Sequence, residues 1–136
     1  MTKSPKSRET SSNPRVLWLI PTLSSRFGGP TTTATNGAVA ERAEGLLTEV
    51  ATTVGPDGPG DSKAALDRLE AAGVPTHAFP RRGSSASLES WGVSLAMSIW
   101  ILRKVSTFDV VHLQYVWCLS SLLGCLAAKA NGIPVV

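Results

Sequence analysis

The glycine pair Gly28-Gly29 is the first feature of the sequence that could do chemistry. It follows the apolar run VLWLIP and directly precedes Pro30. Glycine lets a backbone approach a ligand closely and adopt positive φ. A helix beginning at Pro30 would also point its free N–H groups and positive dipole end at this place. A phosphate or a sugar hydroxyl would suit such a site; a tight turn that merely fits the loop is the alternative.

The second feature is the stretch DVVHLQYVW, residues 109–117. His112 and Gln114 alternate along a predicted strand and therefore share one of its faces. A polar side chain in a buried strand needs a hydrogen-bond partner. Near the carboxyl end of the strand that partner is either a substrate or, for a core histidine, the backbone. Trp117 could form an apolar wall for a sugar ring or pack against the protein.

A basic loop is the third feature. Arg81 and Arg82 begin the segment RRGSSAS, and the Arg82-Gly83-Ser84 step could meet a phosphate or an anionic membrane surface. A solvated basic loop is the alternative.

The elements that must position these residues alternate between strands and helices. An apolar run without polar alternation, as at 16–20, is typical of a strand buried on both faces. Further strands are predicted at 49–54, 74–79, 108–113 and 133–136, and helices at 30–44, 62–72, 88–105 and 119–130. The threonines and Gly37 have low helix propensity, so another requirement must have selected them in the first helix.

This alternation predicts an α/β fold, a doubly wound Rossmann-like parallel sheet of five strands in the order 3-2-1-4-5. Ligands bind such sheets outside the carboxyl ends of the strands, where the order reverses. That point lies between the first and fourth strands, so the glycine loop should face residues 112–117. The chain ends on the strand GIPVV with no helix after it, which suggests a domain truncated at its last strand.

Composition excludes several classes of protein. Of the net charge of +3, residues 1–14 carry +2, and we expect them to form a disordered tail. The rest of the chain, with a net charge of only +1, does not resemble a nucleic-acid platform. The fingerprints GxGxxG, GxxxxGK[ST] and GxSxG are absent, which disfavours a dehydrogenase, a P-loop enzyme or a hydrolase.

The cysteines and the most apolar window bear on compartment and membrane. Cys118 and Cys125 form no CxxC motif, so we expect buried thiols in a reducing cytoplasm and no zinc site. The apolar window 91–105 is too short to span a membrane and predicts a buried helix.

Four segments together resemble a known family. RVLWLIPTLSSRFGGPTTTA, GVPTHAFPRR, FDVVHLQYVW and AKANGIPVV occur in the order found in the amino-terminal domain of family-4-like glycosyltransferases of the GT-B architecture. The resemblance covers about residues 15–136. Members often carry a second histidine where this chain has Gln114, and an Arg-Gly-His step where it has residues 46–49.

The resemblance implies two Rossmann-like domains with a cleft between them. The amino-terminal domain mainly binds the acceptor, a glycan or a lipid. The missing carboxyl-terminal domain binds the nucleotide-sugar donor with paired glutamates and basic residues. By resemblance, residues 15–136 are an incomplete acceptor-binding domain that is inactive by itself.

The resemblance also suggests roles for particular residues. It implies that Gly28 and Gly29 lie near the donor's sugar-diphosphate and that His112 is catalytic, near the transferred sugar. Gln114, Trp117 and Arg82 are then the acceptor-binding candidates, with no metal or other cofactor. We expect a cytoplasmic protein, at the inner face of the membrane if it makes a peripheral membrane contact. A non-catalytic binding or interaction module on the same fold, or the product of a pseudogene, is the alternative.

Overall fold

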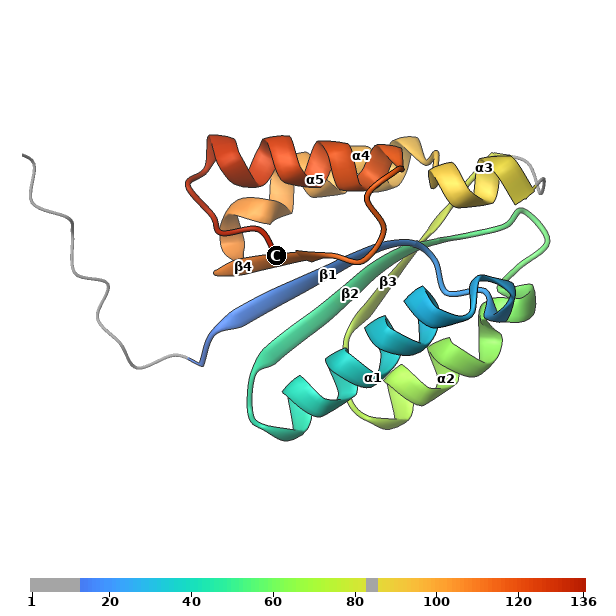
Figure 1. Cartoon of the computed structure of the whole chain (residues 1–136), viewed down its shortest axis with the longest axis horizontal. Helices are drawn as coiled ribbons and strands as arrows, with labels where there is room; N and C mark the ends of the chain where they lie inside the picture. Colours follow the sequence, from blue (N-terminus) through green and yellow to red (C-terminus); the bar gives the residue numbers. More distant parts are fainter. Residues whose placement is uncertain (1–12, 83–85) are drawn as a thin grey trace, which may run out of the picture.

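The structure is a computed structural model that describes residues 13–82 and 86–136. Its centre is a parallel sheet in the order β3-β2-β1-β4 (Figure 1). The strands are β1 (Arg15–Thr22), β2 (Leu47–Val54), β3 (Thr76–Pro80) and β4 (Val110–Leu113). The predicted parallel α/β sheet and the order of its first four strands are therefore confirmed.

The predicted fifth strand is present only as an isolated bridge. Val135 pairs in parallel with Val111, and the Val136 amide donates to the Val111 carbonyl at 2.9 Å. The Leu113 amide donates in turn to the Val136 carbonyl at 2.8 Å. Within the described residues the sheet thus has four strands, and residues 133–136 lie along β4.

The unbroken apolar run of β1 serves two cores at once. Leu17 and Leu19 belong to a buried cluster on one face of the sheet, whereas Val16, Trp18 and Ile20 belong to a cluster on the other. Successive side chains of a strand point to opposite faces. A central strand covered on both sides therefore needs apolar residues at every position.

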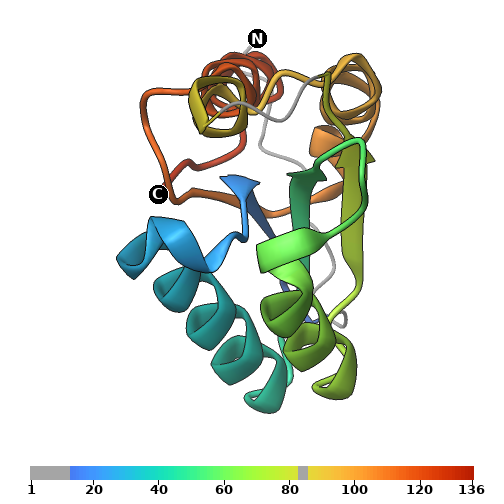
Figure 2. The same ribbon diagram turned by 90° about the vertical axis from the view of Figure 1, so that its right-hand side faces the viewer.

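Two helical layers provide the cover (Figures 1 and 2). Helices α1 (Gly29–Ala43) and α2 (Lys63–Ala71) form the α1–α2 layer. Helices α4 (Leu95–Lys104) and α5 (Leu119–Ala130) form the α4–α5 layer on the opposite face. Short elements connect them: α3 (Ala86–Trp91) and the 3-10 turns η1 (Ser25–Phe27), η2 (Gly60–Ser62) and η3 (Val105–Thr107).

The prediction of one helix over 88–105 is wrong, because the chain breaks between α3 and α4. Gly92 has φ 58°, and a Cβ there would come within 2.8 Å of the Pro21 Cβ. Ser94 then caps α4 by accepting from the Met97 amide at 3.3 Å. A left-handed glycine against the end of β1 and a serine cap together outweigh the apolar periodicity of this segment.

The window 91–105 is also less buried than predicted. Met97 and Ile101 are buried, but Leu95 is 76% exposed and Leu102 is 60% exposed. The sheet can cover only one side of α4, so the apolar residues on its other side remain outside. Among the described residues, no helix is both long and apolar enough to cross a membrane.

Close packing explains the weak helix formers of α1. A Cβ on Gly37 would lie 2.7 Å from the indole of Trp18, so glycine lets α1 approach the sheet at this point. Thr31 and Thr35 are buried, and their hydroxyls donate to the carbonyls of Ser24 and Thr31. Tertiary contacts thus account for residues that local helix propensity disfavours.

The predicted disordered tail lies outside the described residues except for its last two. Asn13 Nδ2 donates to the Gly45 carbonyl at 2.8 Å, and the Pro14 carbonyl accepts from the Leu47 amide at 2.9 Å. These two residues are therefore held against the start of β2.

Cys118 and Cys125 are both free thiols, the first of them buried.

Candidate functional site at the carboxyl edge of the sheet

The glycine pair stands at the junction between η1 and α1. Gly28 has φ 54° and ψ −110°, which explains the choice of glycine there. No side chain caps the amino end of α1, and its first turn carries no acidic residue. A Cβ on either Gly28 or Gly29 would meet no atom within 4 Å. The space in front of this helix end is therefore open, and its N–H groups are free of a side-chain partner.

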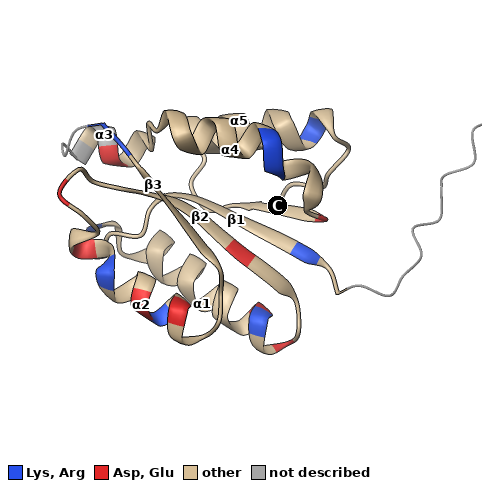
Figure 3. Cartoon of the chain, turned by 180° about the vertical axis from the view of Figure 1, so that it is seen from behind, with Lys and Arg blue, Asp and Glu red and all other residues tan. Residues whose placement is uncertain are grey.

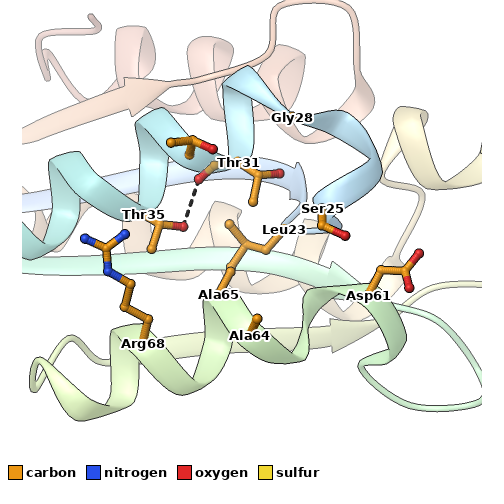
Figure 4. A pocket seen from close by; sticks show the side chains of 10 residues that line it. Leu23, Ser25, Gly28, Thr31, Thr35, Asp61, Ala64, Ala65 and Arg68 are labelled. Carbon is orange, nitrogen blue, oxygen red and sulfur yellow. Dashed lines mark hydrogen bonds between the residues drawn. The ribbon is translucent and has the colours of Figure 1, made fainter.

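A pocket of about 260 Å³ opens beside Gly28, between α1 and α2 (Figure 4). Leu23 and Ala65 supply apolar wall, and Ser25, Thr32, Asp61 and Arg68 supply polar groups. Hydroxyls, a carboxylate and a guanidinium can together bond the hydroxyl groups of a sugar. Its other lining residues are Gly28, Thr31, Thr35 and Ala64.

A buried glutamate that sequence reasoning missed ties this loop to α3. The Glu89 side chain is only 3% exposed. It accepts from Thr22 Oγ1 at 2.9 Å and from Arg26 Nη2 at 2.9 Å. Arg26 also pairs with Asp61, 2.9 Å between Nε and Oδ2. The chain entering Gly28 is therefore held by α3 on one side and by η2 on the other.

Arg81 completes this cluster at the end of β3. Its side chain is almost wholly buried, with Nη2 3.7 Å from Glu89 Oε1 and Nη1 3.3 Å from Thr53 Oγ1. Its Nε has no hydrogen-bond partner among the described residues. The available signal was Glu89 itself, the single acidic residue between 71 and 108, because such a residue needs a partner once it is buried.

His112 lies deeper in the sheet than the glycine loop. Its ring stacks on Trp18, with centroids 3.6 Å apart and planes 12° apart, in line with the Trp18–His112 register of β1 and β4. Burial lowers the pKa of His112 below its ordinary 6.5, and the charge of Glu41 raises it in part. The imidazole is therefore neutral near pH 7, suited to hydrogen bonding rather than to supplying charge.

His112 and the glycine pair do not lie at the same point along α1. Trp18 Nε1 donates to Glu41 Oε2 at 2.8 Å, so His112 sits beside a ring anchored about three helical turns along α1 from Gly29. His112 is thus connected through Trp18 to the part of α1 near Glu41, whereas Gly28 and Gly29 stand at the amino end of that helix. Sequence reasoning placed the two segments opposite each other but not at different depths.

The three predicted acceptor-binding residues lie at or beyond strand ends. The Gln114 amide donates to the Leu19 carbonyl at 3.1 Å, which continues the pairing of β4 by one residue. Trp117 is 82% exposed in the loop before α5. Arg82 is exposed just after β3, while Gly83 and Ser84 lie outside the described residues. In the described ranges, no cluster of three or more His, Cys, Asp or Glu side chains could hold a metal ion.

Residues 28–136 match the family model of the glycosyl transferase 4-like domain. The chain belongs to this family. The match begins at Gly28 and includes all six predicted site residues, so the resemblance read from the sequence is confirmed.

Other comparisons add little to this assignment. No curated protein is significantly similar to this glycosyl transferase 4-like chain. Among solved structures, "AtPrR2 with NADP+ and (+)pinoresinol" has 16% identity and a TM-score of 0.45, covering 90% of this chain and 34% of that one. "AtPrR2 in apo form" has 17% identity and a TM-score of 0.43, with coverages of 88% and 35%. The chain spans about a third of the length of those proteins, and a likeness this weak supports no conclusion about its function.

Proposed function

We propose that this chain is the amino-terminal, acceptor-side half of a glycosyltransferase. The enzyme would move a sugar from a nucleotide-sugar donor to a glycan or lipid acceptor. The observation that carries the proposal is the family match over residues 28–136, which begins at the uncapped end of α1. This end is the part of the chain best suited to a negatively charged group.

The amino end of α1 would act on the departing diphosphate. Sugar transfer passes through an oxocarbenium-like state in which negative charge develops on the leaving group, so fixed dipoles aimed there lower the barrier. Gly28 and Gly29 would let the diphosphate approach the free N–H groups of the helix. The pocket between α1 and α2, with Asp61 and Arg68, offers partners for a sugar's hydroxyls.

His112 is proposed to act near the transferred sugar. As a neutral ring it would donate or accept a hydrogen bond, and its stacking on Trp18 would fix the direction of that bond. Gln114, Trp117 and Arg82 are proposed to bind the acceptor. The exposed indole of Trp117 suits the apolar face of a sugar ring.

We further propose that turnover requires a carboxyl-terminal domain that binds the donor nucleotide. The chain by itself would then be inactive, and no metal or other cofactor would be required. Free thiols at Cys118 and Cys125 suit a reducing compartment, which supports placement in the cytoplasm.

Binding and turnover by the purified chain test the proposal together. We expect short glycans or glycolipid micelles to shift the amide NMR signals of residues 114–117. We also expect no multiple-turnover transfer from any of a panel of nucleotide-sugars. Adding the donor-binding domain of a two-domain family member should restore transfer, and His112→Phe, which keeps the stacking, should reduce it at least tenfold. Multiple turnover by the chain alone would contradict the proposal.

A non-catalytic binding module is the second candidate. Gln114 stands where similar proteins often carry a histidine, which favours lost chemistry on a retained fold. This candidate predicts the same glycan-induced shifts at residues 114–117 but no transfer after complementation. It also predicts that His112→Phe leaves glycan binding unchanged.

A further inference from the structure

The amino end of α1 has two free backbone donors, the N–H groups of Gly29 and Thr31. The first turn of any helix leaves its N–H groups without carbonyl partners in the helix. Here Pro30 has no N–H, and the Gly28 amide donates to the Ser25 carbonyl at 3.1 Å. The Gly29 and Thr31 amides have no hydrogen-bond partner among the described residues. The direction of these two N–H bonds therefore decides how well the helix end can bind an anion.

Ser24 fixes the turn that leads into this helix end. Its carbonyl accepts from the Phe27 amide at 3.1 Å and from Thr31 Oγ1 at 2.9 Å. Its own Oγ accepts from the Arg26 amide at 3.3 Å. Ser24 and Thr31 are both buried, so water does not compete for the bond between them. The position of Ser24 therefore sets the orientation of the first turn of α1.

Ser24 is itself held by a chain of hydrogen bonds that ends at Glu89. The Ser24 amide donates to Thr22 Oγ1 at 3.1 Å, and Thr22 Oγ1 donates its single proton to Glu89 Oε1 at 2.9 Å. Because a carboxylate only accepts, Glu89 fixes the direction of the Thr22 hydroxyl. Arg26 binds the other carboxylate oxygen of Glu89. In Figure 3 the red part of α3 lies beside the blue end of β3, where Arg81 comes within 3.7 Å of Glu89.

We propose that Glu89 is a positioning residue for the diphosphate at the amino end of α1. It acts through Thr22 and Ser24, and it aims the free N–H groups of Gly29 and Thr31. Donors that are fixed in advance need no reorganisation when negative charge develops on the leaving group. This inference rests on the diphosphate role proposed for α1. The charge of Glu89 by itself has the opposite effect, because a carboxylate repels an anion.

Titration of the purified chain with inorganic pyrophosphate at constant ionic strength tests the proposal, with the amide NMR signals of Gly29 and Thr31 as the readout. Thr22→Val keeps a similar shape and the same net charge but breaks the link between Glu89 and Ser24. We expect it to weaken binding roughly fivefold, the equivalent of the ~1 kcal/mol that one hydrogen bond contributes.

Two further variants separate positioning from stability. Thr22→Ser keeps the hydroxyl, and we expect it to bind pyrophosphate within about twofold of the parent chain. Ile101→Val is the stability control, because it truncates a fully buried side chain of α4 on the opposite face of the sheet from α1. It should lower the urea midpoint and leave pyrophosphate affinity within about twofold. A purely structural role of Thr22 would make Thr22→Val behave like Ile101→Val.

Glu89→Gln separates positioning from charge. An amide has one oxygen where the carboxylate has two, so it keeps an acceptor for Thr22 or for Arg26 but not for both. We expect roughly threefold weaker pyrophosphate binding, whereas loss of a negative charge alone would tighten it.

Tighter binding by Glu89→Gln, or unchanged binding by Thr22→Val, would overturn the positioning role and leave the proposed diphosphate site intact. If pyrophosphate does not shift the Gly29 and Thr31 signals of the parent chain, the diphosphate site itself is wrong, and the positioning role fails with it.

Discussion

The α1–α2 layer and the α4–α5 layer cover opposite faces of one sheet, yet their outer surfaces differ. The helices of the first layer carry charges of both signs: Glu41, Arg42, Lys63, Asp67, Arg68 and Glu70. Those of the second carry only cations, among exposed leucines. Both inner surfaces must fill a core against the same strands, so they are alike. The outer surfaces have no such requirement, and their difference therefore points to what each layer meets.

The cluster around Glu89, which links α3 to the ends of β1 and β3, should give the largest effect on stability. Glu89→Ala leaves the buried guanidinium of Arg81 without an acid, and we expect the free energy of unfolding to fall by about 3–5 kcal/mol. Urea denaturation followed by circular dichroism measures this change. Asp67→Ala is the control, because it removes only an exposed pair with Lys63 and should leave the midpoint unchanged. Equal midpoints for the two variants would show that Glu89 does not hold α3 against the sheet.

Truncating one leucine in each layer sharpens the comparison. Leu69 of α2 is fully buried, whereas Leu102 of α4 is 60% exposed. We expect Leu69→Ala to lower the free energy of unfolding by about 2–5 kcal/mol. For Leu102→Ala we expect a change within about 0.5 kcal/mol. A large loss for Leu102→Ala in the same denaturation experiment would mean that this side of α4 is covered within the protein itself.

Each layer also has one helical glycine that packs closely on β1. A Cβ on Gly37 would lie 2.7 Å from the Trp18 ring, and one on Gly124 would lie 2.3 Å from Leu19 Cδ1. The Trp18 ring is held by His112 and Glu41, whereas a leucine methyl can move by side-chain rotation. We expect Gly37→Ala to lower the free energy of unfolding by about 1–3 kcal/mol.

Gly124→Ala should lower it by less, since the helix propensity of alanine, about 1 kcal/mol above that of glycine, offsets a smaller clash. Thermal denaturation of the two variants beside the parent chain gives the ranking. The reverse order would show that α5, not α1, is the more rigidly packed helix.

The smallest expected effect is the pH dependence of the α1–α2 side of the sheet. Burial lowers the pKa of His112 in the folded state, so the unfolded chain binds the proton more readily. Stability should therefore be full above pH 6.5 and decline as the pH falls below it towards the folded-state pKa. His112→Phe keeps the stacking on Trp18 and should flatten this decline, as measured by urea midpoints between pH 7.5 and 5.5. An unchanged slope would place the titration elsewhere.

Much of the fold could be predicted from the sequence, because apolar periodicity and glycine or proline punctuation act locally. The run at 16–20 predicted a strand buried on both faces, and the alternation of elements predicted the order 3-2-1-4. The break at Gly92 could not be predicted, since it depends on the approach of Pro21 from a distant part of the chain.

The candidate site was predicted in part, and for a related reason. Gly28 and Gly29 can be recognised by residue type alone, and the alternation of side chains along a strand predicted that His112 and Gln114 share one face. The partners of Glu89 could not be predicted because Thr22, Arg26 and Arg81 come from separate segments that only the folded sheet brings together. The stacking of His112 on Trp18 likewise required the pairing of β1 with β4.

By itself the sequence determined the order of the first four strands, the presence of a glycine loop after the first of them, and the excess of basic over acidic residues in 90–136, where Asp109 is the single acid. Each follows from residue type and spacing along the chain. Only the tertiary structure decided which polar groups meet at the carboxyl edge and which leucines remain outside. The sheet has two faces and each helix can turn only one side to it, so the covered side depends on packing between distant segments. That choice placed Met97 and Ile101 in the core and left Leu95 and Leu102 at the surface.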